Sequence, residues 1–440
     1  MENHMYVSTI ADGITFRSVR ETRFKNACIS VHFLIPLSRE YATVNVVMLS
    51  LLQRSCSKYP EYTELGRELA MLYGTGVGIG VSNLGNCQML TIEMSMTDDR
   101  FIPDGECISV KCAELLSELI FRPSFSDDGS LFRDDDIEVI LRETEERILS
   151  RINDKAEYAM FRCSEIMCEG EPCGIAAGGY LEDLPGITHE TLADAWHRML
   201  SMSAVNIIMV GGASHEPVER IFAREFAAID RSKAELPAPP EMKHTDKVRE
   251  VTERMEVQQS KMIIGMRLPI IEPDDRTMAA RLMSMLYGGG TTSLLFNQVR
   301  EKLSLCYYCS SSYTRSNGLL YVTSGIEEAN YSKAVEEIKR QLKIIAENEF
   351  TDDEFNASKL FAVSAFAKIN DSIDSIERWY ALQFLAGCVR TPEQAAERMQ
   401  AVTREQVAQC AALAEIDTIY LLAPEMPDSQ GEREGGQDDE

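Results

Sequence analysis

The stretch GGGTTSLLFNQVREKLSLCYY, residues 288–308, joins three consecutive glycines to a cation and a phenol. Arg300 and Tyr307 lie seven residues apart, behind Gly288, Gly289 and Gly290, and both side chains are hydrogen-bond donors. The stretch offers no evident catalytic base beside them. Their chemistry must therefore be that of a guanidinium and a hydroxyl placed close behind a glycine loop.

The local pattern predicts that Arg300 lies near the end of a helix and that Tyr307 lies in a strand. Side chains alternate between the two faces of a strand, so Tyr308 would lie opposite Tyr307. The residues expected to share one face are Leu305, Tyr307 and Cys309, with Cys306 on the other. Taken without any resemblance, the residues favour Tyr307 as an inward core aromatic and Arg300 as part of a surface salt bridge.

Composition limits what the whole chain can be. Its 440 residues exceed what one hydrophobic core usually serves, so two domains are expected. No apolar run is long enough to span a membrane, and no secretory leader is evident at the start, so we expect a cytoplasmic protein. A net charge of −26 argues against nucleic acid or anionic lipid as the main partner.

The chain repeats itself, with three pairs of similar segments in the same order in its two halves. Each half has an apolar strand that ends in proline, then an acidic helix start, then a threonine-capped amphipathic helix that leads into an apolar strand. The pairs are residues 29–36 with 262–269, 132–138 with 350–356, and 187–212 with 402–424. This order indicates a duplication.

The duplication predicts an α+β protein made of two homologous α/β sandwich domains, with helices packed on a mostly antiparallel sheet, that form a half-shell. Hairpin signals, such as the Asn-Gly turn in residues 315–318, favour antiparallel pairing. The expected bounds are 1–231 for the first domain, 232–247 for a proline-rich linker, 248–424 for the second domain, and 425–440 for a disordered acidic tail.

With these features together, the chain resembles the insulinase and pitrilysin family of zinc metallopeptidases, in the smaller form related to mitochondrial processing peptidase. In that family a glycine-rich segment is followed by a phenylalanine, an arginine, and a tyrosine seven residues further on. Gly288–Gly290, Phe296, Arg300 and Tyr307 match this signature. The duplication, the linker and the length also fit, so the resemblance covers nearly the whole chain except the tail.

The resemblance also shows what this chain does not carry. The family binds zinc through His-x-x-Glu-His on the first helix of the first half, where two histidines hold the metal and the glutamate activates water. Here the corresponding residues, Val46 to Ser50, read VVMLS. Glu143 stands at the position of the third zinc ligand, but a single carboxylate is a poor zinc site. His189 and His197 are eight residues apart, too far to share an ion directly.

By resemblance, then, the chain is expected to be a zinc-less subunit of a heterodimeric metallopeptidase, inactive alone. Arg300 and Tyr307 would stabilise the transition state in the active site of a homologous zinc-bearing partner, and Gly288, Gly289, Gly290 and Phe296 would contact the peptide substrate. This chain would hold no cofactor, and the zinc would belong to the partner. The alternative is a catalytically inert peptide-binding or scaffold protein of the same fold.

Overall fold

The computed structural model describes residues 5–425 apart from 233, 235 and 246. The strands are β1 (Met5–Ala11), β2 (Ile14–Arg20), β3 (Asn26–Pro36), β4 (Gly76–Leu84), β5 (Cys87–Thr97), β6 (Ala204–Gly211), β7 (Arg249–Met255), β8 (Ser260–Arg267), β9 (Cys306–Thr314), β10 (Leu319–Ile326) and β11 (Glu415–Pro424). The helices of the first half are α1 (Ala42–Arg54), α2 (Tyr62–Met71), α3 (Ile108–Phe121), α4 (Asp134–Ser150), α5 (Lys155–Met167), α6 (His189–Met202) and α7 (Glu216–Ala227). Those of the second half are α8 (Thr277–Gly288), α9 (Tyr331–Ala346), α10 (Asp352–Ala367), α11 (Ile373–Ala381), α12 (Pro392–Ala401) and α13 (Arg404–Ala412).

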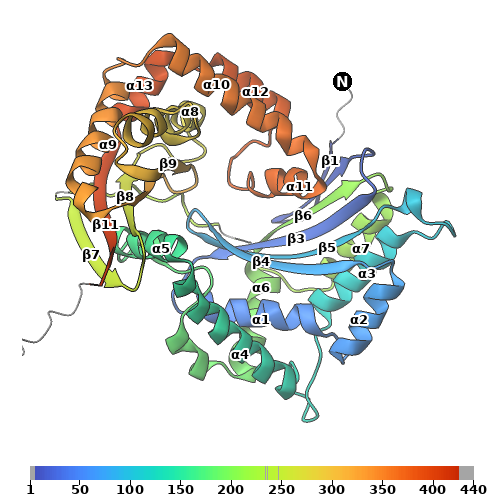
Figure 1. Cartoon of the computed structure of the whole chain (residues 1–440). Helices are drawn as coiled ribbons and strands as arrows, with labels where there is room; N and C mark the ends of the chain where they lie inside the picture. Colours follow the sequence, from blue (N-terminus) through green and yellow to red (C-terminus); the bar gives the residue numbers. More distant parts are fainter. Residues whose placement is uncertain (1–4, 233, 235, 246, 426–440) are drawn as a thin grey trace, which may run out of the picture.

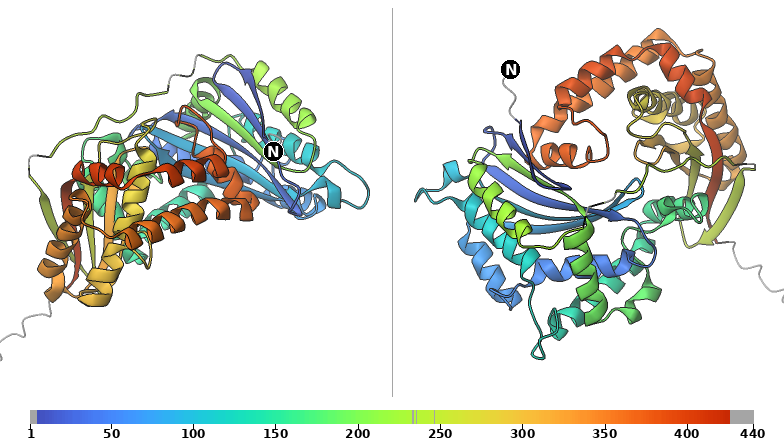
Figure 2. Two further views of the ribbon diagram at one scale, coloured as in Figure 1. Left: turned by 90° about the horizontal axis from the view of Figure 1, so that it is seen from above. Right: turned by 180° about the vertical axis from the view of Figure 1, so that it is seen from behind.

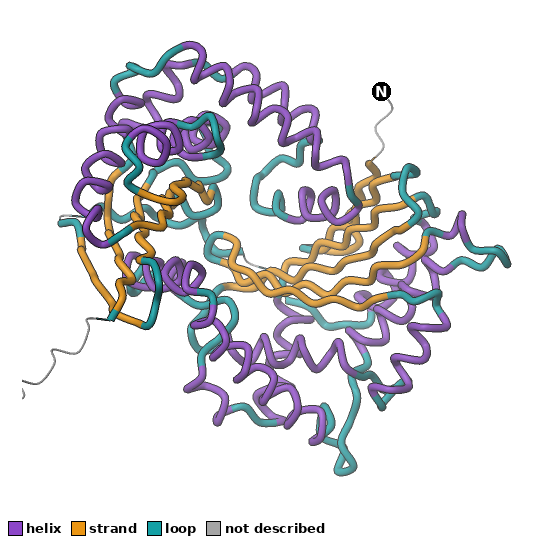
Figure 3. Tube along the Cα trace, viewed as in Figure 1, coloured by secondary structure: helices purple, strands orange, loops and turns teal. Residues whose placement is uncertain are grey.

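Within the described residues the strands form two sheets, which Figures 1 and 3 show as separate layers. The first has the strand order β1-β2-β6-β3-β5-β4 and the second the order β7-β11-β8-β10-β9. Only β2 with β6 and β7 with β11 pair in parallel among these strands, and the other pairs are antiparallel. The expected α+β class with mostly antiparallel sheets is confirmed.

The two sheets repeat one strand order, which explains the repeated sequence segments. Apart from β1, each strand of the first sheet has a counterpart at the same place in the second, so that β3 corresponds to β8 and β6 to β11. The paired segments form equivalent elements: two central strands, the helices α4 and α10, and the helix–strand units α6–β6 and α13–β11. Each domain range expected from the sequence contains one of these sheets, and we keep the bounds themselves as a proposal.

The helix starts follow from local capping chemistry. Thr188 caps α6 and Thr403 caps α13, each accepting a hydrogen bond from the backbone N–H three residues on. Thr351 caps α10, and the Glu354 side chain accepts a hydrogen bond from the Thr351 N–H in return. Asp352 and Asp353 then place negative charge in the first turn, where the helix dipole favours it.

One face of each sheet is covered by helices of its own half. Phe16, Ile29 and Phe33 of the first sheet are buried in a core that includes Leu52 of α1 and Leu116 of α3. The second sheet has its own core against its helices, with residues such as Ile264, Leu286, Val322, Ile338 and Val407. In Figures 1 and 2 these helix layers lie on the outer sides of the two sheets.

The inner face of each sheet is covered by a helix from the opposite half. α5 packs Cys163 and Met167 against Ile263 and Tyr321 of the second sheet. A Cβ on Gly265 would lie 2.5 Å from the Met167 sulfur, so this strand position is a glycine because the helix passes directly over it.

α11 makes the reciprocal contact, placing Ile373 and Ile376 in a cluster with Cys28 of β3 and Ile208 of β6. The two helices occupy equivalent places in the repeat, since α5 follows α4 and α11 follows α10. Both begin with a side-chain cap, Asp154 for α5 and Ser372 for α11. Figure 1 shows both helices on the inner sides of the sheets, which gives the molecule its half-shell form.

Two expectations concern the chain outside these layers. The acidic tail expected over 425–440 lies, except for Glu425, outside the described residues, as do three residues of the expected linker. Among the described helices, none combines the length and the apolar character that crossing a membrane would require.

Candidate functional site

The glycine segment begins where α8 touches the edge strand of the second sheet. Gly288 is buried, and a Cβ there would lie 2.5 Å from the Ser311 nitrogen and 3.0 Å from the Ser310 carbonyl carbon. The Ser311 hydroxyl donates to the Ser284 carbonyl at 2.7 Å and ties the same helix to β9. Gly288 thus lets α8 pack directly on the backbone of β9, just beyond Tyr307.

Arg300 lies in a π-helical turn, Phe296–Lys302, between α8 and β9. Val299 is fully buried and anchors the turn, while Arg300 is exposed beside it. The Arg300 guanidinium carbon lies 4.7 Å from the centre of the Phe296 ring, and its ion pair with Glu301 is long, at 3.6 Å. Phe296 therefore supports the stem of Arg300, and most guanidinium donors stay accessible to another molecule. The expectation that Arg300 lies near a helix end is confirmed.

A tight turn carries the chain from this helical turn into β9. Ser304 adopts a left-handed backbone conformation with a φ of 50°. The Leu305 N–H donates to the Val299 carbonyl at 2.9 Å, and the Ser304 N–H donates to the Arg300 carbonyl at 3.1 Å. These bonds fix the start of β9 relative to Arg300.

Tyr307 lies in a β-bulge, which corrects the expected face alternation. In the pairing with β10, Tyr308 is opposite Gly325 and Cys306 is opposite Ile326, so Tyr307 is the extra residue. Cys306 and Cys309 are consequently both buried in the core beneath the helices, rather than on opposite faces. A hydrogen bond with Cys306, together with burial, raises the pKa of Cys309 well above its usual value.

The bulge also moves Tyr307 away from Cys309, so the prediction that these residues share a face is wrong. Tyr307 is 61% exposed, whereas Cys309 is 4% exposed. The Tyr307 hydroxyl donates to Glu327 Oε1 at 3.3 Å. Tyr308 is half-buried near Lys261, whose ammonium nitrogen lies 5.6 Å from the ring centre. Tyr307 is thus an exposed donor at the free edge of the second sheet, not a core aromatic.

The residues that stand in place of a zinc motif cannot bind a metal. Val46, Val47, Met48 and Leu49 of α1 are 0 to 3% exposed and form part of the first core. The Ser50 hydroxyl donates to the Val46 carbonyl of the same helix at 2.9 Å. Since these side chains offer no nitrogen or carboxylate ligand, the site does not fit zinc.

The position of the third zinc ligand does not form a metal site either. Glu143 on α4 is exposed, whereas its neighbour Thr144 is 2% exposed and faces the interior. In the described part of the chain, no cluster of three or more His, Cys, Asp or Glu side chains has the arrangement to hold a metal ion.

The histidines have structural partners instead. His189 at the start of α6 contacts the Leu131 carbonyl at 2.8 Å and Asp134 at 2.9 Å. These contacts raise the pKa of His189, with the backbone contact as the largest cause. The His197 ring packs 4.7 Å from that of Trp196. Both histidines therefore make contacts within the fold.

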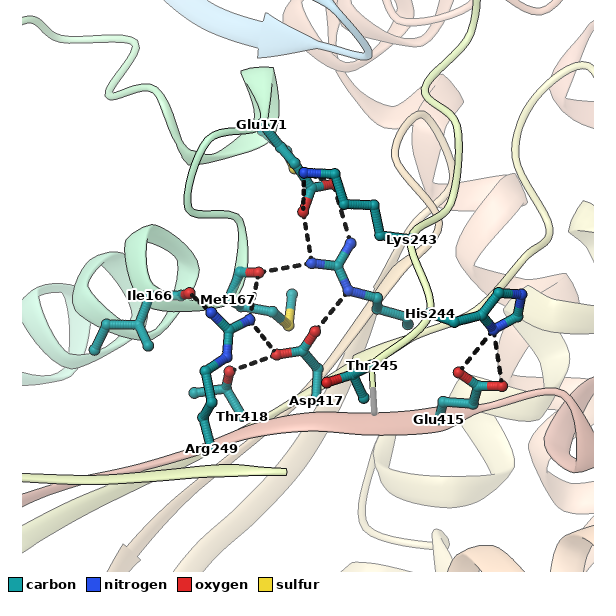
Figure 4. A network of polar contacts seen from close by, with 12 residues as sticks. Ile166, Met167, Glu171, Lys243, His244, Thr245, Arg249, Glu415, Asp417 and Thr418 are labelled. Carbon is teal, nitrogen blue, oxygen red and sulfur yellow. Dashed lines mark hydrogen bonds and ion pairs between the residues drawn. The ribbon is translucent and has the colours of Figure 1, made fainter. Parts of the chain in front are cut away.

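A buried ionic network that sequence reasoning missed fixes α5 on the second sheet (Figure 4). Arg267 on β8 donates to Asp417 at 2.6 Å, to Glu171 at 2.7 Å and to the Met167 carbonyl at 2.6 Å. Arg249 on β7 donates to the other Asp417 oxygen at 2.6 Å and to the Met167 carbonyl at 2.8 Å. Two arginines thus satisfy carbonyls at the C-terminal end of α5, where the helix dipole favours cations.

The electrostatics of this network favour its charged form. Burial alone would raise the pKa of Asp417, but hydrogen bonds from Arg267, Thr418 and Arg249 outweigh it and lower that pKa. The one available signal was an arginine in the otherwise apolar strand MIIGMRLP, at residue 267. That signal does not reveal the partners, because Glu171 and Met167 come from the other half of the chain.

The comparisons with known proteins agree with this geometry. Residues 186–360 match the family model described as "Peptidase M16 inactive domain". The "Probable inactive metalloprotease YmfF" of Bacillus subtilis strain 168 is 26% identical over 413 residues, which cover 93% of this chain and 96% of that protein.

Two solved structures share the fold. A conserved protein from Enterococcus faecalis V583 superimposes with a TM-score of 0.87 at 24% identity, covering 97% of this chain and 100% of that one. A structure titled as a peptidase M16 inactive domain, from Pseudomonas fluorescens, has a TM-score of 0.76 at 18% identity and covers 96% of this chain and 98% of that one. Residues 186–360 are therefore similar to the M16 inactive domain, and nearly the whole chain is similar to a protein named as a probable inactive metalloprotease. The chain itself contains no His-x-x-Glu-His motif.

Proposed function

We propose that this chain is the zinc-less subunit of a heterodimeric peptidase, whose other subunit is a homologous zinc-bearing chain. Arg300 and Tyr307 act in the partner's active site during peptide-bond hydrolysis. The observation that carries this proposal is that the Arg300 and Tyr307 side chains are accessible and only weakly paired. Both are exposed, and their recorded partners are weakly held: Glu301 at 3.6 Å from Arg300 and Glu327 at 3.3 Å from Tyr307.

The chemistry follows from what these groups can give. Attack on a peptide carbonyl places negative charge on its oxygen only in the transition state, so a donor aimed at that oxygen lowers the barrier. The Tyr307 hydroxyl can exchange its long bond to the exposed Glu327 for a shorter one to the oxyanion. The Arg300 guanidinium can hold the same oxygen or a neighbouring carbonyl of the substrate through its accessible N–H groups.

The residues around the donors support a substrate surface. Phe296 holds the Arg300 stem, and Gly289 and Gly290 are partly exposed behind the buried Gly288. We propose that Phe296, Gly289 and Gly290 contact the peptide, and that Gly288 acts through the packing of α8 on β9. The peptide would then pass along the edge of the second sheet that carries Tyr307.

The second candidate is an inert peptide-binding or scaffold protein of the same fold. The specific observation that favours it is the similarity to the Bacillus relative, whose name describes it as a probable inactive metalloprotease. The two functions differ in one respect. A scaffold needs no exposed hydroxyl at Tyr307, whereas a subunit that completes an active site does.

Reconstitution tests the proposal. The chain and a zinc-bearing homologue from the same genome would be purified separately, and hydrolysis of a quenched-fluorescence peptide library would be measured for each protein and for the mixture. We expect little activity from either protein alone and a large gain from the mixture. A homologue that is fully active alone and unaffected by this chain would refute the proposal and leave the scaffold function.

A further inference from the structure

A cavity of about 440 Å³ lies where β4 of the first half meets the second half. Its walls come from α8, the end of β9, the turn that follows it, α11 and residues 382–390. Leu84, Met278 and Trp379 give it apolar surface. Thr314, at the cavity, lies roughly 20 Å from Tyr307 along β9, since a strand rises about 3.3 Å per residue. The cavity is thus separate from the proposed catalytic donors.

Three arginines line this cavity in a chain of net charge −26. They are Arg281 on α8, Arg315 in the β9–β10 turn, and Arg390 in the loop before α12. Within the described residues, the Arg281 side chain makes no hydrogen bond or ion pair, and its guanidinium carbon packs 4.5 Å from the centre of the Phe366 ring. Burial and the nearby Arg315 lower the pKa of Arg281 to about 10. The cavity thus contains three arginines and one carboxylate, Glu272, among its described lining residues.

Arg390 is held at the cavity by its backbone. Its carbonyl accepts hydrogen bonds from Trp379 Nε1 at 2.8 Å and Gln383 Nε2 at 3.0 Å, and its N–H donates to Gln383 Oε1 at 2.8 Å. These three hydrogen bonds fix the position of the Arg390 backbone. The loop therefore holds Arg390 at the cavity in a defined position.

The only carboxylate lining the cavity, among the described residues, is Glu272. Arg315 Nε lies 3.1 Å from Glu272 Oε1, but the buried Oε2 has no hydrogen-bond partner among the described residues. Asn83 Oδ1, from β4, is likewise buried without one. Burial raises the pKa of Glu272 in spite of Arg315, Arg390 and Arg281 nearby. Buried acceptors of this kind are costly unless a ligand or water supplies a donor.

We propose that this cavity binds the carboxylate end of a short peptide. The terminal carboxylate lies between Arg281, Arg390 and Arg315. The last peptide N–H donates to Glu272 Oε2 or Asn83 Oδ1. The last side chain packs against Trp379 and Leu84. A peptide end has the anion, the donor and the apolar group that the walls require. Inorganic phosphate satisfies the arginines and carries an O–H donor, but it has no apolar group to pack against Trp379 and Leu84. The volume lies within the range of ordinary small-ligand pockets.

Binding to the full-length chain alone tests this site, without the zinc-bearing partner, so its outcome is independent of the proposed function. The probes are N-acetyl-Ala-Leu with a free carboxylate, the same dipeptide as its carboxamide, and inorganic phosphate. Calorimetry measures affinity, and the fluorescence of Trp379, one of two tryptophans, reports on the cavity. We expect the acid to bind at least about 10-fold more tightly than the amide and than phosphate, as expected for a charge-assisted hydrogen bond.

Variants locate the site. Arg281→Met should weaken binding of the acid about 10- to 100-fold and leave the melting temperature unchanged or higher, because it removes a half-buried cation without a partner. Arg390→Met provides a second variant on a different element. The control is Arg276→Met, five residues earlier near the same helix, where Arg276 pairs with Asp274. Equal binding of acid and amide, no binding of either, or tighter binding of phosphate would overturn the proposal.

Discussion

His32 Nε2 on β3 lies 2.6 Å from Glu377 Oε1 on α11, so a strand of the first sheet and a helix of the second half share a buried hydrogen bond. The Ser30 hydroxyl donates to the same oxygen at 2.6 Å, and His32 Nδ1 contacts the Thr91 hydroxyl at 2.8 Å. The Ser30 hydroxyl, both His32 ring nitrogens and Glu377 Oε1 all have partners, as buried polar groups require. The contact is the counterpart, on the first sheet, of the arginine network that holds α5 on the second.

This contact predicts a pH-dependent stability. Burial would raise the pKa of Glu377, but hydrogen bonds and charge from His32 and a hydrogen bond from Ser30 lower it. A pKa that is lower in the folded state stabilises the protein above about pH 4, the unfolded value, and this contribution is lost as the pH falls through the folded value. Glu377→Gln should therefore cost about 1–3 kcal/mol at pH 7 and much less at pH 3. Urea unfolding at both pH values measures this, and a cost independent of pH would contradict the assignment.

Arg267→Met should destabilise the protein by about 3 kcal/mol or more, because it leaves Asp417 and the end of α5 without their buried cation. The urea midpoint should fall, and amide hydrogen exchange should accelerate in α5. The control is Lys343→Met on α9, an exposed partner of Glu347, which should change stability by less than about 1 kcal/mol. If α5 exchanges at an unchanged rate in the variant, the network does not hold the helix in place.

Tyr307→Phe removes one hydroxyl from an exposed ring, so folding and assembly should survive. In the reconstituted complex, kcat should fall about 10²- to 10³-fold, the usual cost of losing an oxyanion donor. The matched control is Tyr62→Phe on α2, with a similar exposure of 59% against 61%. A kcat within about twofold of the parent value would exclude the donor role.

Arg300→Ala should lower kcat/KM in the complex and raise KM more than Tyr307→Phe does, if the guanidinium also holds the substrate in its ground state. The control is Arg340→Ala on α9, an exposed arginine that pairs with Glu337. Steady-state kinetics with one peptide separate kcat from KM. An unchanged KM together with an unchanged kcat would mean that Arg300 does not touch the substrate.

The isolated chain should contain far less than one zinc per molecule, because the buried apolar residues Val46 to Leu49 supply no ligand. Elemental analysis of tag-free protein, run beside the zinc-bearing homologue as the positive control, measures this. One zinc per chain that survives dialysis would show that the chain binds the metal at a site other than residues 46–50.

The repeated architecture could be predicted because its determinants are local. Apolar strands ending in proline, threonine caps such as Thr351 and the Asn-Gly turn before β10 specify elements from short stretches of sequence. Gly318 in that turn has a φ of 66°, and a Cβ there would lie 2.4 Å from the Leu268 carbonyl oxygen. A glycine of this kind can be recognised from the sequence, because the Asn-Gly pair marks the turn that requires it.

The details of the candidate site could not be predicted, because they depend on pairing between distant residues. The bulge at Tyr307 arises from the register of β9 against Gly325 and Ile326, which no pattern within β9 contains. Arg281 lies within an apolar run, and only the meeting of α8 with residues 315 and 390 makes it part of a cavity. The packing of α5 and α11 on the sheets of the opposite halves could not be predicted for the same reason, since each helix packs on a strand more than 90 residues away in the chain.

Because α11 covers the inner face of a sheet from the opposite half, this face stays uncovered during part of synthesis on the ribosome. The first sheet is complete at Gly211, but the helix that covers its inner face begins only at Ile373. At about 5–20 residues per second, the roughly 160 intervening residues take on the order of 10 to 30 s to translate. For that interval Cys28, Ile208 and Val210 face solvent or a chaperone, although their strands have already been made. The nascent chain is therefore most prone to aggregation after its first half has been synthesised and before α11 emerges.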